Sequence, residues 1–186
     1  MSVQLAKHSF TVAEYQRMGE AGVLSEDDRF ELIEGEVIEI SPIGRRHAAC
    51  VGRLNRTLTL LLQHVALVWM QNPIQLSDYS EPQPDIVVLK LRDDFYDNSL
   101  PTPDDVLLVV EVSDSTLEYD RQIKLPLYAR AGVPEVWIVN LANEVIETCS
   151  QPSGDSYLTA KPFARGEAVQ SSAVEALRVE ASAVLG

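Results

Sequence analysis

The sequence predicts a mixed α/β fold, in which one β-sheet is flanked by helices. Three features of its 186 residues indicate this fold class. Short apolar or alternating runs typical of strands recur along the chain, and longer segments between them have the apolar spacing of amphipathic helices. Residues 106–110 are apolar without a break, which is typical of a central strand covered on both faces. The order of these elements indicates an α/β sandwich built around one core.

The N-terminal part predicts a helix and a β-hairpin in addition to the sheet. Thr11, with Glu14 three positions later, forms a capping box that begins a short helix. Residues 29–40 alternate as two short strands around a tight turn at Glu34-Gly35.

A longer amphipathic helix is expected from about Arg46. Its apolar positions recur at intervals of three and four residues over about five turns. Arg53 and Arg56 share a polar face of this helix with Arg46. The apolar positions are Val51, Leu54, Leu58, Leu61 and Val65.

The rest of the chain predicts further strands and a second helix. A serine or threonine within residues 113–116 caps this helix, which runs to about Ala131 and ends before Gly132. Pro126 restricts the regular part of the helix to its later turns. After Ser150 we expect another strand or hairpin and a short terminal helix. The strands are expected at residues 67–70, 74–76, 86–89, 106–110, 136–140 and 145–148.

Length and composition predict a single domain over residues 1–186, with a core at about 29–150 and a C-terminal extension at 151–186. Apolar residues make up 46% of the chain and charged residues 23%, which excludes a disordered or low-complexity protein. No stretch approaches the roughly 18 apolar residues of a membrane helix, and the N-terminus has no run typical of a signal peptide. We therefore expect a cytoplasmic protein without a membrane partner.

The net charge is −13, but it is unevenly distributed. Residues 40–77 contain no Asp or Glu, so this segment carries +4. An evenly spread negative charge would repel nucleic acid, whereas a basic segment can contact phosphates. Two interpretations stay open, a nucleic-acid-binding surface and a helix with a solvated basic face. The basic residues are Arg45, Arg46, Arg53 and Arg56.

Three ionisable residues lie where hydrophobic patterning does not place them. Asp85 opens an apolar strand, Glu111 closes the apolar run of the next main strand, and Lys124 falls on the helix that follows. A carboxylate buried at a strand end is costly unless a cation or hydrogen bonds compensate it. Hard oxygen ligands favour Mg²⁺ or Mn²⁺. The residues alone leave open a structural ion network and a metal site.

The segments that carry Asp85 and Glu111 resemble the active-site signature of the PD-(D/E)XK nuclease superfamily. More closely, the chain is similar to the bacterial Uma-two family of restriction-endonuclease-like proteins, over roughly residues 29 to 141. The matching motifs are residues 30–36, Ser41-Pro42 with His47, Pro84-Asp85-Ile86-Val87, residues 111–116, residues 119–121 through Lys124, Tyr128, residues 131–135 and residues 137–139.

This resemblance implies a restriction-endonuclease-like fold and a Mg²⁺- or Mn²⁺-dependent DNA endonuclease. It implies that Asp85 and Glu111 hold the metal and that Lys124 supplies the cationic group, which in the parent superfamily stands at the position of Ser113. His47 is a further candidate for placing a phosphate or a water, or else a capping or surface histidine. Glu31 is either a further ligand or a partner of Arg29, and Tyr119, Asp120 and Tyr128 are expected to support the helix.

The main alternative function is a binding or assembly protein that keeps the nuclease fold and has lost catalysis. The net charge favours this alternative, whereas the complete set of Asp85, Glu111 and Lys124 favours the nuclease. Hydrolysis of a different phosphoester also stays open, because the same site chemistry would serve it. A homodimer is expected, with an interface of apolar residues around Val133 and Trp137.

Overall fold

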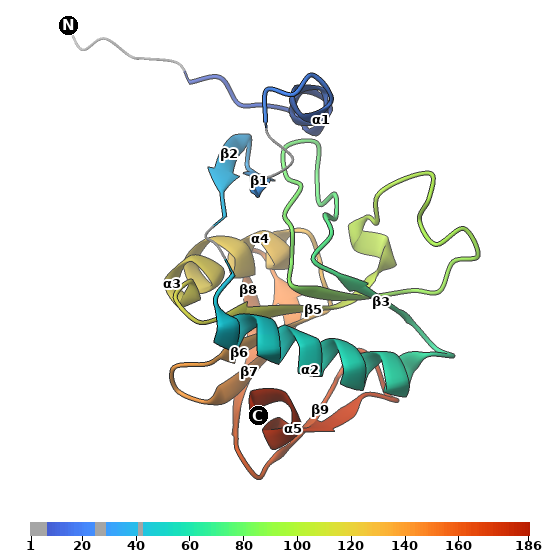
Figure 1. Cartoon of the computed structure of the whole chain (residues 1–186), viewed down its shortest axis with the longest axis vertical. Helices are drawn as coiled ribbons and strands as arrows, with labels where there is room; N and C mark the ends of the chain where they lie inside the picture. The colour runs from blue at the N-terminus through green and yellow to red at the C-terminus, as the bar shows by residue number, and fades with distance from the viewer. Residues whose placement is uncertain (1–6, 25–28, 41–42) are drawn as a thin grey trace, which may run out of the picture.

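The computed structural model describes residues 7–24, 29–40 and 43–186. Ser41 and Pro42, part of one matching motif, lie outside these residues. The chain begins with the predicted helix and hairpin, and in Figure 1 both stand beyond the end of the main sheet. The three elements are α1 (Val12–Glu20), β1 (Phe30–Ile33) and β2 (Glu36–Glu39).

Both local predictions for this part are confirmed. The Thr11 side chain accepts a hydrogen bond from the backbone of Glu14, and the Glu14 side chain accepts one from the Thr11 backbone, which completes the capping box. The turn at Glu34 and Gly35 has positive φ at both residues, as a tight hairpin requires. Gly35 also lies against Ser9, where a Cβ atom would come within 2.6 Å of the Ser9 Cβ.

The main sheet has six strands in the order β3-β4-β5-β6-β7-β8. β5 and β6 pair in parallel and the other neighbours pair antiparallel, so the sheet is mixed, as predicted. The strands are β3 (Leu67–Met70), β4 (Ile86–Leu89), β5 (Val106–Ser113), β6 (Glu135–Asn140), β7 (Val145–Ser153) and β8 (Ser156–Ala164).

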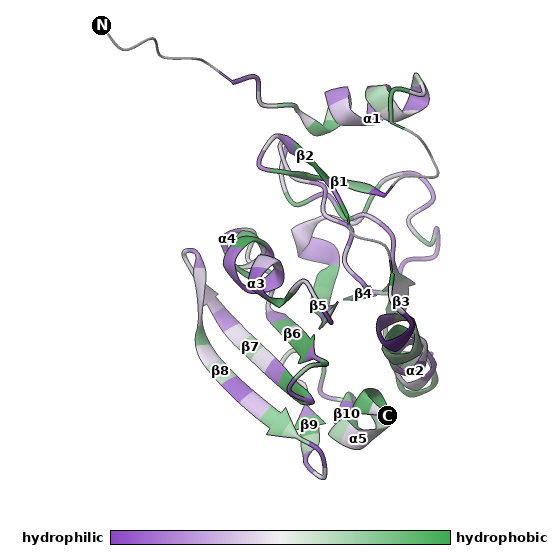
Figure 2. Cartoon of the chain, turned by 60° about the vertical axis from the view of Figure 1, so that its left-hand side comes forward, coloured by the Kyte–Doolittle hydropathy of each residue, from purple (hydrophilic) through white to green (hydrophobic). Residues whose placement is uncertain are grey.

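Helices cover both faces of this sheet (Figure 2). On one face, α2 (Arg45–Leu62) packs through an apolar core that includes Trp137. On the other face a second core includes Tyr128 and lies beneath a helical segment in three parts. This segment consists of α3 (Leu117–Tyr119), a turn of π-helix, η2 (Asp120–Lys124), and α4 (Leu125–Arg130).

The C-terminal part covers the same face of the sheet as α2. It forms the small hairpin of β9 (Ala168–Gln170) and β10 (Arg178–Glu180), followed by α5 (Ala181–Leu185), which lies beside α2. A 3₁₀ turn, η1 (Pro103–Asp105), precedes β5. The predicted final hairpin and terminal helix are therefore present.

Three predictions about these elements need correction. Residues 74–76 form no strand, although the Ile74 and Leu76 amides donate to the carbonyls of Pro82 and Ser80. Leu61 in α2 and Val65 after its end are exposed, and Leu62 is buried instead.

Val133 and Trp137 are fully buried, because they pack in the two cores. They therefore cannot form the expected dimer surface. Within the part of the chain that the structure describes, no helix is both long and apolar enough to cross a bilayer.

Candidate active site

The predicted catalytic residues line one pocket of about 160 Å³. Four of them come from four different elements and one lies just before β4, and they meet beside the ends of β4 and β5. The residues are Glu31, His47, Asp85, Glu111 and Lys124. The structure therefore brings together every side chain proposed for catalysis from the sequence.

Strand pairing explains why the two carboxylates converge. Ile86 of β4 pairs with Val110 of β5, so Asp85, just before β4, lies next to Glu111. The Asp85 amide donates a hydrogen bond of 3.4 Å to Glu111 Oε2. Residues 26 positions apart in the sequence thus face one pocket because two strands are hydrogen-bonded in this register.

Asp85 is held as an anion by its neighbours. His47 Nε2 lies 2.9 Å from Asp85 Oδ2, and the Val112 amide donates to the same oxygen at 2.9 Å. Burial raises the pKa of Asp85, but the hydrogen bond and charge of His47 and the Val112 amide outweigh burial and leave the pKa below its ordinary value. His47 therefore lies in the pocket with Asp85 and is neither a helix cap nor a surface residue.

Glu111 has the opposite tendency, because it is fully enclosed. Lys124 Nζ lies 2.7 Å from Glu111 Oε1, and the Tyr128 hydroxyl donates to that oxygen at 2.5 Å. Burial raises the pKa of Glu111 to about 8, against the attraction of Lys124 and with repulsion from Asp120 and Asp85. Glu111 consequently binds a proton readily near neutral pH when no other cation is present.

Lys124 is buried between two carboxylates. Its Nζ atom lies 3.4 Å from Glu31 Oε2 in addition to the contact with Glu111. Burial alone lowers the pKa of Lys124, but Glu111, Tyr128, Glu31 and Asp120 together raise it well above its usual range. The ammonium ion is therefore a fixed positive charge inside the pocket.

Glu31 connects the N-terminal hairpin to the site. Its Oε1 accepts a hydrogen bond from the Tyr119 hydroxyl at 2.8 Å, and its Oε2 accepts one from the Gln83 amide at 3.1 Å. The suggested pairing of Glu31 with Arg29 does not occur, because Arg29 donates to the Gln83 side chain instead. Glu31 thus fixes Lys124 from a strand outside the main sheet.

Ser113, the last residue of β5, contacts a further carboxylate. Its hydroxyl donates to Asp120 Oδ2 at 2.7 Å, and the Thr116 hydroxyl donates to the same oxygen at 2.7 Å. Burial raises the pKa of Asp120 despite the charge of Lys124 and these two bonds. The polar network therefore extends from β5 into η2.

Two tyrosines were expected only to support the helix. Tyr128 contacts Glu111 directly and Tyr119 contacts Glu31, so both hydroxyls belong to the site. Tyr128 follows Lys124 by four residues, a spacing that places two side chains on one helix face and was a usable signal. Gln71, whose side chain donates to Asp85 Oδ1 at 3.4 Å, had no signal in the sequence.

The four arginines of the basic segment lie on α2 but differ in their surroundings. Arg45 and Arg56 are exposed. Arg46 is exposed as well, although it donates to the Leu141 carbonyl at 2.8 Å and pairs with Asp114 at 3.7 Å. Arg53 is half-buried and donates to two carbonyls of α5, at 2.9 and 3.0 Å. Arg53 therefore holds the terminal helix, whereas the other three present charge to solvent.

Comparison with known proteins identifies the family. A family model named Uma2 and described as "Putative restriction endonuclease" matches residues 12–182. The chain belongs to this family. No curated protein matches it. Among solved structures, it is similar to a crystal structure described as a "putative nuclease belonging to DUF820 from Anabaena variabilis ATCC 29413", with a TM-score of 0.72 over 95% of this chain and 97% of that one.

The identity between this Uma2 chain and that structure is 13%, so the likeness shows a shared fold. The predicted family and the predicted mixed sheet flanked by helices are both confirmed.

The donor atoms of the pocket fit a hard divalent cation. Among the residues that the structure describes, Asp85 Oδ1 accepts only the long bond from Gln71, and Glu111 Oε2 only the long bond from the Asp85 amide. Each carboxylate therefore keeps one lightly used oxygen. Among the described residues no three His, Cys, Asp or Glu side chains form a ready metal cage. Mg²⁺ suits such a place, because it is commonly held by one or two carboxylates, with water and phosphate oxygens as its other ligands.

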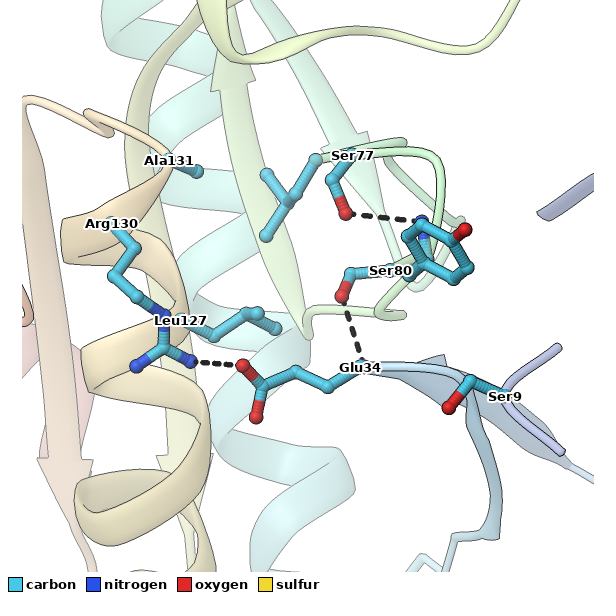
Figure 3. A pocket seen from close by; sticks show the side chains of 9 residues that line it. Ser9, Glu34, Ser77, Ser80, Leu127, Arg130 and Ala131 are labelled. Carbon is cyan, nitrogen blue, oxygen red and sulfur yellow. Dashed lines mark hydrogen bonds and ion pairs between the residues drawn. The ribbon is translucent and has the colours of Figure 1, made fainter. Parts of the chain in front are cut away.

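A larger cavity of about 610 Å³ lies elsewhere, between the β1–β2 turn, residues 76–80 and α4 (Figure 3). It shares no lining residue with the catalytic pocket. Its charged lining residues are Glu34 and Arg130, which form an ion pair of 2.8 Å. It is lined by none of the residues that the sequence predicts for catalysis.

Proposed function

We propose that this chain is a Mg²⁺- or Mn²⁺-dependent DNA endonuclease that hydrolyses phosphodiester bonds. The observation that carries the proposal is the convergence of Asp85, Glu111 and Lys124 in one pocket, from two strand ends and a helix. Membership of the Uma2 family supports the nuclease class and DNA as the substrate.

Asp85 and Glu111 would hold the cation through their lightly used oxygens. The bound cation would lower the pKa of a coordinated water and offset charge on the phosphate oxygens. His47 keeps Asp85 ionised and in place, since it bonds the oxygen that the cation does not need.

Lys124 would stabilise the negative charge that grows on the phosphate, or orient the attacking water. It is suited to either task because its ammonium ion is buried and permanently charged. Glu31 helps to set the position of Lys124 through a contact of 3.4 Å, and the contact of Lys124 with Glu111 is shorter, at 2.7 Å. Exposed arginines of α2 would meet the phosphate backbone.

The test is metal-dependent nicking of supercoiled plasmid by the purified protein. Glu111→Gln and Lys124→Ala should each lower the nicking rate by at least about a hundredfold, since each removes a group that acts on the reacting atoms. Placing lysine at position 113 in the Lys124→Ala variant should restore part of the activity, because Ser113 borders the same network.

Glu135→Gln is the matched control for the glutamate, because Glu135 is an equally buried strand carboxylate outside the pocket. It should nick plasmid at the parent rate below its melting temperature. Wild-type protein that binds DNA but does not cut it with either metal would favour the alternative of a binding protein that has lost catalysis.

A further inference from the structure

A second polar cavity, of about 300 Å³, lies beside the catalytic pocket. Its walls come from α2, the β6–β7 turn, the end of β8 and the end of α5, and α2 and α5 run side by side in Figure 1. We call it the arginine cavity, because three arginines and one glutamate provide its charged lining. Its residues are Arg46, Ala49, Arg53, Leu141, Glu144, Arg165, Leu185 and Gly186.

The fold brings the third arginine to this place from a distant part of the sequence. Arg165 follows β8, and its guanidinium donates to both carboxylate oxygens of Glu144, at 2.8 and 3.1 Å. Arg165 and then Arg46 hold the pKa of Glu144 below its ordinary value, so the two arginines act on one carboxylate. Three arginines and one glutamate thus give the cavity an excess of positive charge, although the net charge of the chain is −13.

The arginines keep hydrogen-bonding capacity for a ligand. Arg46 and Arg53 donate to backbone carbonyls, which carry no formal charge. A guanidinium has more N–H groups than these bonds use, and its planar fork matches the oxygens of a phosphate. Since a water molecule occupies about 30 Å³ of liquid, the cavity has room for a phosphate group and its hydration.

The position of the cavity indicates which phosphate it would take. Arg46 lines the cavity and pairs at 3.7 Å with Asp114, and Asp114 lines the catalytic pocket. A single ion pair thus separates the two sites. A DNA strand bound at the catalytic pocket would therefore have the arginine cavity beside it as a place for another of its backbone phosphates.

We propose that the arginine cavity binds a backbone phosphate of the DNA next to the one that is cut, with Arg46 and Arg165 as its phosphate contacts. This inference rests on the proposed function for its substrate. Arg53 stabilises the cavity wall through its bonds to α5.

The test measures DNA binding without divalent metal, so that cleavage plays no part. Fluorescence anisotropy of a labelled duplex over a salt series should show that Arg165→Gln weakens binding about three- to tenfold at low salt. It should also flatten the log–log salt slope by about 0.9, the value for one lost phosphate contact.

Arg130→Gln is the matched control. Arg130 is as exposed as Arg165, 41% against 42%, and pairs with one glutamate at the same 2.8 Å, but it lies outside the arginine cavity. Both variants change the net charge equally, so an equal effect of the two would overturn the proposal. Glu144→Gln should have the opposite effect on DNA affinity. It removes the charge that pairs with Arg165 and should tighten DNA binding about threefold.

Inorganic phosphate distinguishes a site for the free anion from a site for DNA. If phosphate raises the melting temperature of the wild type but not of Arg165→Gln, while DNA affinity is the same in both, the cavity takes free phosphate and the proposal is wrong. Wild-type protein that does not bind DNA at low salt overturns it too.

Failure of the proposed function gives a different pattern. In a Glu111→Gln background, which should lose cleavage, Arg165→Gln should still weaken DNA binding and flatten the salt slope, because Glu111 lies outside the arginine cavity. If the wild type binds DNA through Arg165 and never cuts, the nuclease proposal fails alone. If the wild type cuts DNA but Arg165→Gln leaves the salt slope unchanged, only the proposal for the arginine cavity is wrong.

Discussion

Glu111 lies at the centre of the buried network, since it contacts Lys124, Tyr128 and the Asp85 amide at once. A carboxylate that is 3% exposed loses nearly all of its hydration. Lys124 compensates this loss only in part, because it is shared with Glu31. Burial therefore favours the protonated form of Glu111 despite the charge of Lys124.

The pH dependence of stability should report this arrangement. The folded pKa of Glu111, about 8, lies above its ordinary value of 4.5, so folding favours the protonated form. This contribution to the free energy of unfolding is present below pH 4.5 and is lost as the pH rises through 8.

Between pH 4.5 and 8 the folded protein keeps a proton that the unfolded chain has released. The free energy of unfolding therefore falls by about 1.4 kcal/mol for each pH unit, which lowers the melting temperature by roughly 3–5 °C for a chain of this size. Metal-free Glu111→Gln cannot release it, so its melting temperature should fall less steeply with pH than that of the wild type. An equal fall of the two melting temperatures between pH 5 and 8 would contradict the pKa assigned to Glu111.

Tyr128 should act as a positioning residue for Glu111. Its hydroxyl donates to the same oxygen that contacts Lys124 and so leaves the other oxygen for the proposed cation. Tyr128→Phe should weaken metal affinity or nicking by about ten- to a hundredfold, the usual effect of losing such a partner. Calorimetric titration with Mn²⁺ measures the affinity without any need for turnover.

The matched control is Tyr157→Phe, because the Tyr157 hydroxyl donates to the Val133 carbonyl, away from the pocket. It should lower stability and leave Mn²⁺ affinity unchanged. An equal loss of affinity in both variants would mean that Tyr128 acts only through the general stability of the fold.

At the scale of elements, one helical segment supplies much of the site. It contributes Tyr119 before its π-turn, Asp120 and Lys124 within it and Tyr128 after it. The π-turn ends two residues before Pro126, whose missing N–H would interrupt a regular α-helix. The irregularity thus follows from the sequence, and single-turn π segments are frequent at functional sites.

The C-terminal segment is fixed to the sheet by one buried carboxylate. Glu135 Oε1 accepts from the Trp137 indole at 2.7 Å. Its Oε2 accepts from the amides of Ser172 and Ala173 and from the Ser171 hydroxyl, all within 2.9 Å. Glu135 therefore attaches the loop after β9 to β6 and belongs to the fold rather than to the catalytic site.

Glu135→Gln should destabilise this attachment strongly. Both oxygens face fixed N–H donors, so the amide group of glutamine must point at one of them in either orientation. The expected cost is about 2–3 kcal/mol, which lowers the melting temperature by roughly 5–10 °C. Differential scanning calorimetry measures it, and hydrogen exchange should show the loss of protection at residues 168–186 first. Unchanged protection there would mean that apolar packing alone fixes the segment.

At the scale of the whole molecule, the sheet separates two apolar cores, and the candidate active site lies beside the ends of its central strands. Positive charge is concentrated on the α2 side, where the fold adds Arg165 to the basic segment. The acidic remainder of the chain would keep DNA away from other surfaces. The burial of Val133 and Trp137 leaves any dimer interface to be sought elsewhere on the surface.

The sequence by itself determined the elements and their order. Capping residues, turn glycines and apolar periodicity act over a few residues, so they predict α1, the hairpin, α2 and most strands without knowledge of the fold. The sequence also shows that Asp85, Glu111 and Lys124 are charged residues within apolar segments, because that pattern too extends over only a few residues. Their joint role was suggested by family resemblance, since no local pattern joins them.

The tertiary structure alone decided which faces meet. Leu61 and Val65 have the spacing of a buried face, yet the sheet and α5 cover Leu62 instead. The contacts of Lys124 with Glu31, and of Arg165 with Glu144, join residues from separate elements. Side-chain periodicity fixes which residues share a face, but the element that covers that face is chosen by packing and strand register over the whole chain, which no short window of sequence contains.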